Sequence, residues 1–177
     1  PLTFLKIDTS RLSLGYISYA TFDNTYFIHN EWWRLITPMI VHFSFAHLAF
    51  NCLWVYVLGS KIELYDGSFL FLSLVIISSI ASNFFQYYFS EPSIFGGLSG
   101  VIYAMLGYCM IIELEVKNER YELPPAIYLF MIAWMVLGFM GVLDLFGFGS
   151  VANFAHLGGL ISGLIFAMIA KSIKPYS

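Results

Sequence analysis

The chain has 177 residues, of which 59% are hydrophobic and only 11% are charged, and its formal net charge is −3. Soluble globular domains have roughly 45–50% apolar and about 25% charged residues, so this composition excludes a soluble domain and a disordered segment. The small negative charge and the lack of any run of Lys or Arg argue against nucleic acid as a partner and against a polybasic lipid-binding tail. Cys52 and Cys109 lie inside apolar stretches and predict neither a disulfide framework nor a zinc site. The composition instead predicts an integral membrane protein.

Five stretches free of Asp, Glu, Lys and Arg are each long enough to cross a bilayer as a helix. Such a span needs about 20 apolar residues at a rise of about 1.5 Å each. The next longest charge-free stretch, residues 12–22, is too short. We therefore predict an all-α fold, a polytopic transmembrane helix bundle that forms a single domain over residues 1–177. Its helices are predicted at residues 38–58, 68–89, 95–112, 124–143 and 151–170.

The distribution of basic residues predicts the orientation of the bundle. An odd number of spans places the two termini on opposite sides of the membrane, and the side with more Lys and Arg faces the cytoplasm. This bias places the C-terminus in the cytoplasm. Residues 1–37 carry many aromatic side chains, which favours a segment at the outer membrane interface, and they lack the pattern of a signal peptide. The basic residues are Lys61, Lys117, Arg120, Lys171 and Lys174 on the C-terminal side, and Lys6, Arg11 and Arg34 on the other.

Polar side chains at membrane depth are costly, so they mark either a helix contact or a functional cavity. The first, third and fifth predicted spans all begin at the outer face and carry such groups in their outer parts. Residues three or four apart share a helix face, so the polar groups of each span point together and one outward-facing pocket can hold them all. These groups are His42, His47 and Asn51 in the first span, Ser99 and Tyr103 in the third, and Asn153 and His156 in the fifth.

Small residues predict which helices meet. Gly159 and Gly163 in the fifth span, and Gly100 and Ala104 in the third, have the four-residue spacing that lets two helix backbones approach closely. Such a crossing would bring His156, which shares its face with Gly159, to Ser99. The alternative is open at this point: the glycines form generic packing motifs and the histidine only makes an interhelical hydrogen bond.

Ser99 follows Gly97 and Leu98 at the start of a predicted helix. Free backbone N–H groups and the positive end of the helix dipole at that position suit a developing oxyanion. A neutral imidazole nearby can accept the serine proton, so that the serine oxygen attacks a carbonyl carbon. The third and fifth spans contain no Asp or Glu, so the pattern predicts a Ser99–His156 dyad and not a triad. The side chains of His47 and Asn51 can donate hydrogen bonds to the oxyanion.

This set of residues resembles the rhomboid intramembrane serine proteases in their bacterial form. The resemblance covers nearly the whole chain from Trp33 onward, and its motifs are highly specific when taken together. The matching positions are Trp33-Arg34; His42-Phe43-Ser44 with His47 and Asn51; Glu63-x-x-x-Gly67; Gly97-Leu98-Ser99-Gly100 with Tyr103; and Ala155-His156 with Gly159 and Gly163.

The resemblance implies a role for each of these positions. Ser99 is implied as the nucleophile and His156 as the general base, with Tyr103 stacked on the imidazole. The implied oxyanion hole consists of His47, Asn51 and the Ser99 backbone N–H. A role in holding water and a packing role are both open for His42. Gly97 is implied to support the active site, and the implied structural residues are Arg34, Glu63, Gly100, Gly159 and Gly163.

The same resemblance implies the activity and its setting. The expected protein is a serine endopeptidase of the rhomboid type that cleaves transmembrane proteins in the lipid bilayer, with no metal, nucleotide or organic cofactor. Substrate helices are expected to enter past the first and fourth spans. The expected location is the bacterial inner membrane, with the active site open to the outer face, and the oligomeric state is left open.

One departure from the family pattern concerns the number of spans. The bacterial core has six spans and five are predicted here; the span that should precede the outer loop is missing. Pro1 begins in Leu-Thr-Phe-Leu, which resembles the last turns of that helix, so we expect an incomplete form of the protein or an ordered part that begins there.

Two other functions are weighed against the protease. An inactive rhomboid-like protein could bind client helices without cutting them, but such relatives typically lack the serine or the histidine. A small transporter or channel should carry polar residues through the full depth of its spans, whereas the inner halves of these spans are almost wholly apolar.

Overall fold

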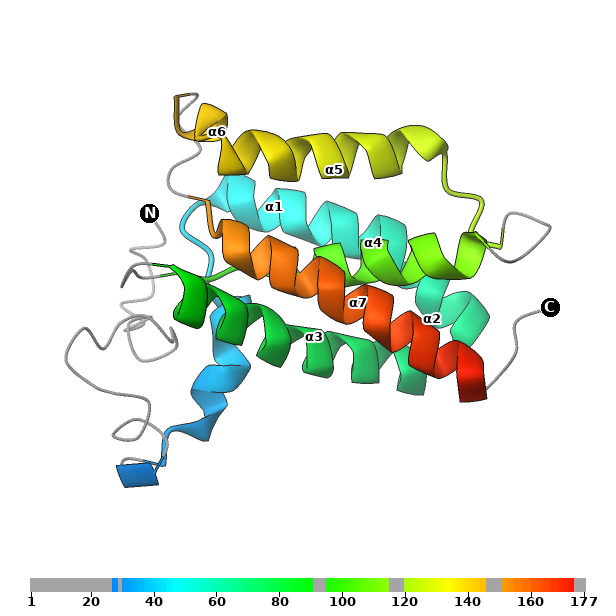
Figure 1. Ribbon diagram of the computed structural model, residues 1–177, viewed down its shortest axis with the longest axis horizontal. Coiled ribbons are helices and arrows are strands. Elements are labelled where there is room, and N and C mark those ends of the chain that lie inside the picture. Colours follow the sequence, from blue (N-terminus) through cyan, green and yellow to red (C-terminus); the bar gives the residue numbers. More distant parts are fainter. Residues whose placement is uncertain (1–26, 29, 91–94, 115–119, 146–150, 174–177) are drawn as a thin grey trace.

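The computed structural model describes residues 27–28, 30–90, 95–114, 120–145 and 151–173. Within these ranges every regular element is a helix, as Figure 1 shows, which confirms the predicted all-α fold. The short helices η5 (Trp32–Leu35) and η6 (Thr37–Ile40) come first. They are followed by α1 (Phe45–Trp54), η7 (Val55–Gly59), α2 (Ser60–Asp66), α3 (Ser68–Phe89), α4 (Ser99–Glu113), α5 (Pro125–Phe139), α6 (Val142–Leu145) and α7 (Asn153–Ile173).

Three helices are long and apolar enough to cross a membrane. They are the continuous helix Phe45–Asp66, which joins α1, η7 and α2, together with α3 and α7. The helices α4 and α5 are also apolar, but each has 15 residues and is therefore only about 22 Å long. Five helices thus correspond to the five predicted spans, and the multi-span helical bundle expected from the sequence is confirmed.

The first long helix lies further along the chain than the predicted range 38–58. Pro38 stands in the first turn of η6, and the chain is extended at Val41 before α1 begins. The Ser44 side chain accepts a hydrogen bond from the backbone N–H of His47, which caps the helix at Phe45. His47 therefore lies in the first turn of the helix, nearer to its start than the predicted range 38–58 implies.

The far end of this helix is stabilised by an ion pair that joins distant parts of the chain. The Asp66 carboxylate accepts hydrogen bonds from the Arg120 guanidinium, at 2.8 Å for the closest pair of atoms, and from the hydroxyls of Tyr108 and Tyr121. Burial, together with the hydrogen bond to Asp66, raises the pKa of the Tyr121 hydroxyl, which stays protonated as a donor. Because Asp66 is paired, the helix continues to this residue and ends at Gly67, which has a positive φ of 93°.

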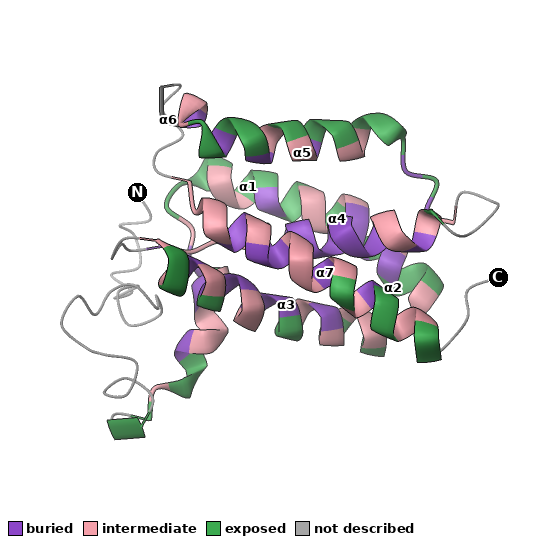
Figure 2. Ribbon diagram, viewed as in Figure 1, coloured by how far each residue is buried: buried purple, intermediate pink, exposed green. Residues whose placement is uncertain are grey.

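The helix α4 lies at the centre of the bundle. Every residue from Gly100 to Cys109 is buried, and Figure 2 shows much of this helix in the colour of buried residues. In Figure 1, α5 lies along one edge of the bundle and α3 along the opposite edge, with α4 and α7 between them. Because α4 lies at the centre, the helices packed around it fix the position of Ser99, the first residue of α4.

Glycines let α4 and α7 touch backbone to backbone. A Cβ placed at Gly159 would lie 1.9 Å from the carbonyl oxygen of Gly100, and one placed at Gly163 would lie 2.0 Å from that of Ala104. No side chain fits at either position, so these glycines are required for the observed approach of the two helices.

Some expectations lie outside the described residues. They are the continuation of a preceding helix from Pro1, the interfacial position of residues 1–26, and the side of the membrane assigned to Lys6, Arg11, Lys117 and Lys174.

Candidate active site

Ser99 and His156 meet at the crossing of α4 and α7. Ser99 is the first residue of α4, and His156 lies in the first turn of α7. The Ser99 Oγ and the His156 Nε2 are 2.8 Å apart, and the imidazole is buried, with 5% of its surface exposed. With the ring hydrogen on Nδ1, the serine hydroxyl donates to Nε2, which is the geometry that proton removal from the serine requires.

The imidazole is held by packing. Its Nδ1 is buried and has no hydrogen-bond partner among the described residues. The ring of Tyr103 lies against it, with ring centroids 4.7 Å apart and planes inclined by 32°. The Tyr103 hydroxyl donates to the carbonyl oxygen of Met131 on α5 at 2.8 Å, which fixes the tyrosine ring in place. The imidazole is therefore held by an aromatic ring that is itself bonded to α5.

Two further residues, His47 and Asn51, lie beside Gly97 in the segment that precedes Ser99. Gly97 has a φ of +122°, a conformation that residues with a side chain rarely adopt. A Cβ placed there would lie 2.8 Å from the His47 Nε2 and 3.4 Å from the Asn51 Nδ2. The Asn51 amide nitrogen is buried and has no partner among the described residues, which leaves a strong donor facing this segment. The sequence-predicted oxyanion residues are therefore close together beside the start of α4.

His42 lies next to these residues. Its Nδ1 is 3.0 Å from the carbonyl oxygen of Ile40, and its ring makes an edge contact with the ring of His47, with centroids 4.9 Å apart. Its Nε2 is buried without a partner in the described part of the chain. His42 thus lies in contact with the His47 ring.

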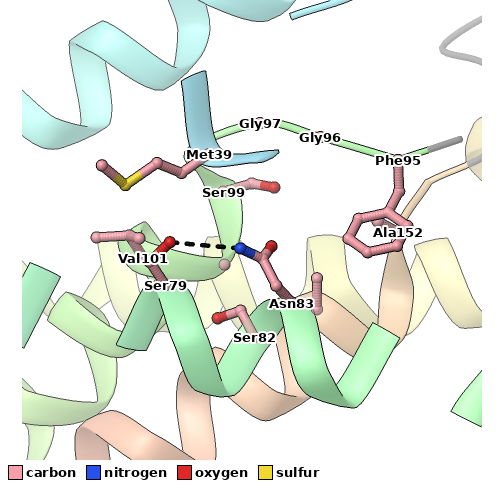
Figure 3. A pocket seen from close by; sticks show the side chains of 12 residues that line it. Met39, Ser79, Ser82, Asn83, Phe95, Gly96, Gly97, Ser99, Val101 and Ala152 are labelled. Atoms are coloured by element: carbon pink, nitrogen blue, oxygen red, sulfur yellow. Dashed lines mark hydrogen bonds between the residues drawn. The ribbon is translucent and has the colours of Figure 1, made fainter. Parts of the chain in front are cut away.

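A small cavity lies beside Ser99, as Figure 3 shows, and α3 supplies its polar side. Ser79, Ser82 and Asn83 are buried residues of α3 that point toward it. These three residues were not predicted from the sequence, although their spacing along one face of the predicted span 68–89 was a readable signal. The cavity is lined by Met39, Ser79, Ser82, Asn83, Phe95, Gly96, Gly97, Ser99, Gly100, Val101, Ala152 and Ala155.

Another polar residue of α3 positions the start of α7. The side-chain oxygen of Gln86 accepts the backbone N–H of Ala155 at 3.0 Å, and Ala155 is the neighbour of His156. This bond satisfies one of the N–H groups that the first turn of a helix leaves without an intrahelical acceptor. Gln86 therefore fixes the turn that carries the imidazole, and it too was missed from the sequence.

The remaining predicted residues lie away from the Ser99–His156 contact. Arg34 is buried in η5, where its Nε is 2.6 Å from the Glu31 carboxylate. Glu63 is exposed in α2 and accepts a hydrogen bond from the Ser68 hydroxyl at 2.8 Å, near the far end of the bundle. Among the described residues, no group of three or more His, Cys, Asp or Glu side chains is placed to hold a metal ion.

Comparison with known proteins gives a consistent assignment. The sequence model of the family described as Rhomboid domain matches residues 29–172. The chain is 37% identical over 135 residues to the Rhomboid protease GlpG of Serratia proteamaculans (strain 568) and to that of Yersinia pestis (strain Pestoides F). Each match covers 76% of this chain and 47% of the relative, so the chain spans about half the length of the curated relatives it matches. With its membrane-length helices, the chain is an integral membrane protein that belongs to the rhomboid family.

Proposed function

We propose that this chain is a serine endopeptidase that cuts peptide bonds in or near the transmembrane helices of other membrane proteins. The observation that carries the proposal is the 2.8 Å contact between Ser99 Oγ and His156 Nε2, made between two membrane helices at the start of α4. Relatives that are named rhomboid proteases support the same activity.

The chemistry follows from the positions of these two side chains. His156 Nε2 takes the proton from the Ser99 hydroxyl as the oxygen forms a bond to the scissile carbonyl carbon. The carbonyl oxygen becomes negatively charged and accepts hydrogen bonds from the His47 ring, the Asn51 amide and the Ser99 backbone N–H. The C–N bond then breaks, and the imidazolium gives its proton to the leaving amine. The product of this half-reaction is an acyl-enzyme on Ser99.

The second half-reaction requires water. His156 removes a proton from a water molecule that attacks the ester carbon, and the serine oxygen leaves and regains the proton. The cavity beside Ser99 is lined by hydroxyl and amide groups from Ser79, Ser82 and Asn83, which are suitable partners for water in an otherwise apolar bundle. We infer that this cavity holds the hydrolytic water.

The contact between α5 and α1 is the proposed entrance for substrate helices. It is made by aromatic side chains: Phe50 lies against Trp134, with ring centroids 5.9 Å apart, and Trp54 stacks on Phe130 at 6.0 Å. Ring contacts of this kind separate without breaking backbone hydrogen bonds. An extended substrate segment that enters there reaches Ser99 from the lipid side.

The proposed location is the bacterial inner membrane, with Ser99 near the outer face. This orientation is supported by the predicted excess of basic residues on the opposite side of the bundle, where Lys61, Arg120 and Lys171 belong to the described part of the chain.

The test is cleavage of a labelled transmembrane substrate by the purified chain in detergent or liposomes. Ser99→Ala and His156→Ala should each abolish cleavage, since each removes one half of the dyad. Ser162→Ala is the matched control, because within the described part of the chain its hydroxyl bonds only to the Gly159 carbonyl on its own helix, and it should cut at the wild-type rate. Cleavage by a folded Ser99→Ala protein would refute the proposal. A wild-type protein that binds the substrate, does not cut it and is not labelled at Ser99 by a fluorophosphonate would be the non-catalytic client binder.

A further inference from the structure

We propose that Asn83 and Ser79 are positioning residues for catalysis. They hold the backbone of the segment before α1, and the Pro38 carbonyl of that segment fixes the Gly97 peptide that faces the oxyanion. This inference rests on the proposed protease function and assigns to α3 a part in it that does not involve contact with the reacting atoms.

The two side chains are joined to each other and to the segment before α1. The Asn83 Nδ2 donates to the carbonyl oxygen of Leu35 at 2.8 Å, and the Ser79 Oγ donates to that of Ile36 at 3.2 Å. The Asn83 Nδ2 also lies 3.4 Å from the Ser79 Oγ, a contact drawn as the dashed line in Figure 3. Both hydrogens of the Asn83 side-chain amide and the hydrogen of the Ser79 hydroxyl thus have an acceptor. Both side chains are buried, so leaving a carbonyl unpaired here is costly.

The segment held in this way is bonded on its other side to the catalytic region. Ile36 directly precedes η6, and Pro38 lies within it. The Pro38 carbonyl oxygen accepts the backbone N–H of Gly97 at 2.9 Å and that of Val41 at 3.1 Å. One carbonyl therefore fixes both the end of η6 and the glycine two residues before Ser99.

Close packing transmits the position of η6 to this glycine segment. A Cβ placed at Gly96 would lie 2.9 Å from the Pro38 oxygen and 2.8 Å from the Val41 Cβ, so the two backbones are in direct contact. No gap between η6 and the glycine segment can absorb a shift of η6 away from α3, so such a shift must move Gly97. Donors for an oxyanion act only when they are placed in advance, and a misplacement of about 1 Å can cost about 100-fold in rate.

The competing explanation is that Ser79 and Asn83 act only through water in the cavity that they line. Water is needed to release the acyl-enzyme but not to form the adduct with a fluorophosphonate, whereas the oxyanion region is needed for both. The second-order rate of labelling at Ser99 therefore separates a positioning role from a water-holding role.

The test compares Asn83→Ala with an isosteric pair at Ser79. Ser79→Thr keeps the hydroxyl and Ser79→Val replaces it with a methyl group of the same shape. The control is Tyr121→Phe, which loses one buried hydrogen bond to Asp66 at the far end of the bundle. Four quantities are measured: kcat per titrated active site, KM, the labelling rate, and hydrogen exchange of the Gly97 amide.

We expect Asn83→Ala and Ser79→Val to lower kcat and the labelling rate together by about 10- to 100-fold, with KM changed less than about twofold. Exchange of the Gly97 amide should become faster in both. Ser79→Thr should restore all of these values, and Tyr121→Phe should keep the wild-type kcat per active site although it unfolds more easily.

Other outcomes overturn the inference. A lower kcat with an unchanged labelling rate assigns the residues to water, and a loss of stability alone, as in Tyr121→Phe, makes them ordinary structural residues. If the wild type neither cuts the substrate nor is labelled at Ser99, the proposed function fails. Hydrogen exchange of the Gly97 amide then tests the link to α3 on its own. An exchange rate of the Gly97 amide that is unchanged in Asn83→Ala and Ser79→Val refutes the link to α3. Exchange that is faster in these two variants, but not in Ser79→Thr, supports it.

Discussion

A methyl group added at Gly159 should separate α4 from α7 and break the contact between Ser99 and His156. The added Cβ would lie 1.9 Å from the carbonyl oxygen of Gly100, and ordinary contacts begin at 3.4 Å, so the backbones must move apart by about 1.5 Å. The obstructing oxygen belongs to a helix backbone and cannot rotate away as a side chain can. Overpacking of a core costs about 1–3 kcal/mol, and a clash between two backbones belongs at the upper end of that range.

The same displacement affects the proposed dyad of Ser99 and His156. Gly100 is the neighbour of Ser99, and Gly159 lies one turn after His156, so the separation occurs where the two side chains meet. Adding even half of it to the 2.8 Å contact brings the atoms to about 3.5 Å, where a hydrogen bond is largely lost. We therefore expect Gly159→Ala to lose about 3 kcal/mol of unfolding free energy and about 100-fold in kcat.

Reversible unfolding in mixed detergent micelles measures the first quantity, and cleavage per titrated active site measures the second. Gly163→Ala meets the Ala104 carbonyl one turn further from the dyad, so it should lose similar stability and less activity. Ile165→Ala, on the half-exposed face of the same helix, should change the unfolding free energy by less than about 1 kcal/mol. Wild-type unfolding and turnover in Gly159→Ala would show that the backbone contact between α4 and α7 has no such role.

Three further changes probe other parts of the molecule. Gly97→Ala places a methyl group 2.8 Å from the His47 ring and should slow fluorophosphonate labelling by about 100-fold with helical circular dichroism retained; labelling at the wild-type rate contradicts this. Asp66→Ala leaves the Arg120 guanidinium without its buried carboxylate and should lower the unfolding free energy by about 3–5 kcal/mol while kcat per active site stays unchanged; a loss below about 1 kcal/mol contradicts it. Trp134→Ala removes the ring that joins α5 to Phe50 and should raise kcat/KM severalfold for a transmembrane substrate but not for a short soluble peptide, and equal effects on both substrates would exclude an entrance at this contact.

The positions of the helices could largely be read from charge-free stretches, because charged groups are rare at membrane depth. The predicted span 68–89 coincides with α3, since Gly67 interrupts the chain on one side of it. The first helix could not be bounded in this way. The predicted range ends at residue 58, before Lys61, whereas α2 continues to Asp66, which is paired with an arginine more than fifty residues away. A pairing at that distance has no local sequence signal.

The candidate site was readable because it consists of residue types that are costly in a membrane. Ser99, His156 and Asn51 stand out in apolar spans, and the four-residue glycine spacing indicates which helices cross. The residues of α3 were missed for a topological reason: the pocket was predicted between spans that begin at the outer face. A span that runs the opposite way ends at that face, so Ser79 and Asn83 in its second half lie beside Ser99.

The helices that carry the dyad and the helix at the proposed entrance are held by different kinds of contact. Glycines join α4 and α7 backbone to backbone, so the distance between Ser99 and His156 is fixed by covalent geometry and packing. By contrast, α5 meets α1 through aromatic rings and bonds to α7 through the Asn153 side chain and the Gly138 carbonyl. The Tyr103 hydroxyl, bonded to Met131 of α5, connects the two parts. A displacement of α5 by more than about 1 Å breaks that 2.8 Å bond and releases the ring that packs on His156, so this hydrogen bond couples opening of the proposed entrance to the orientation of the imidazole.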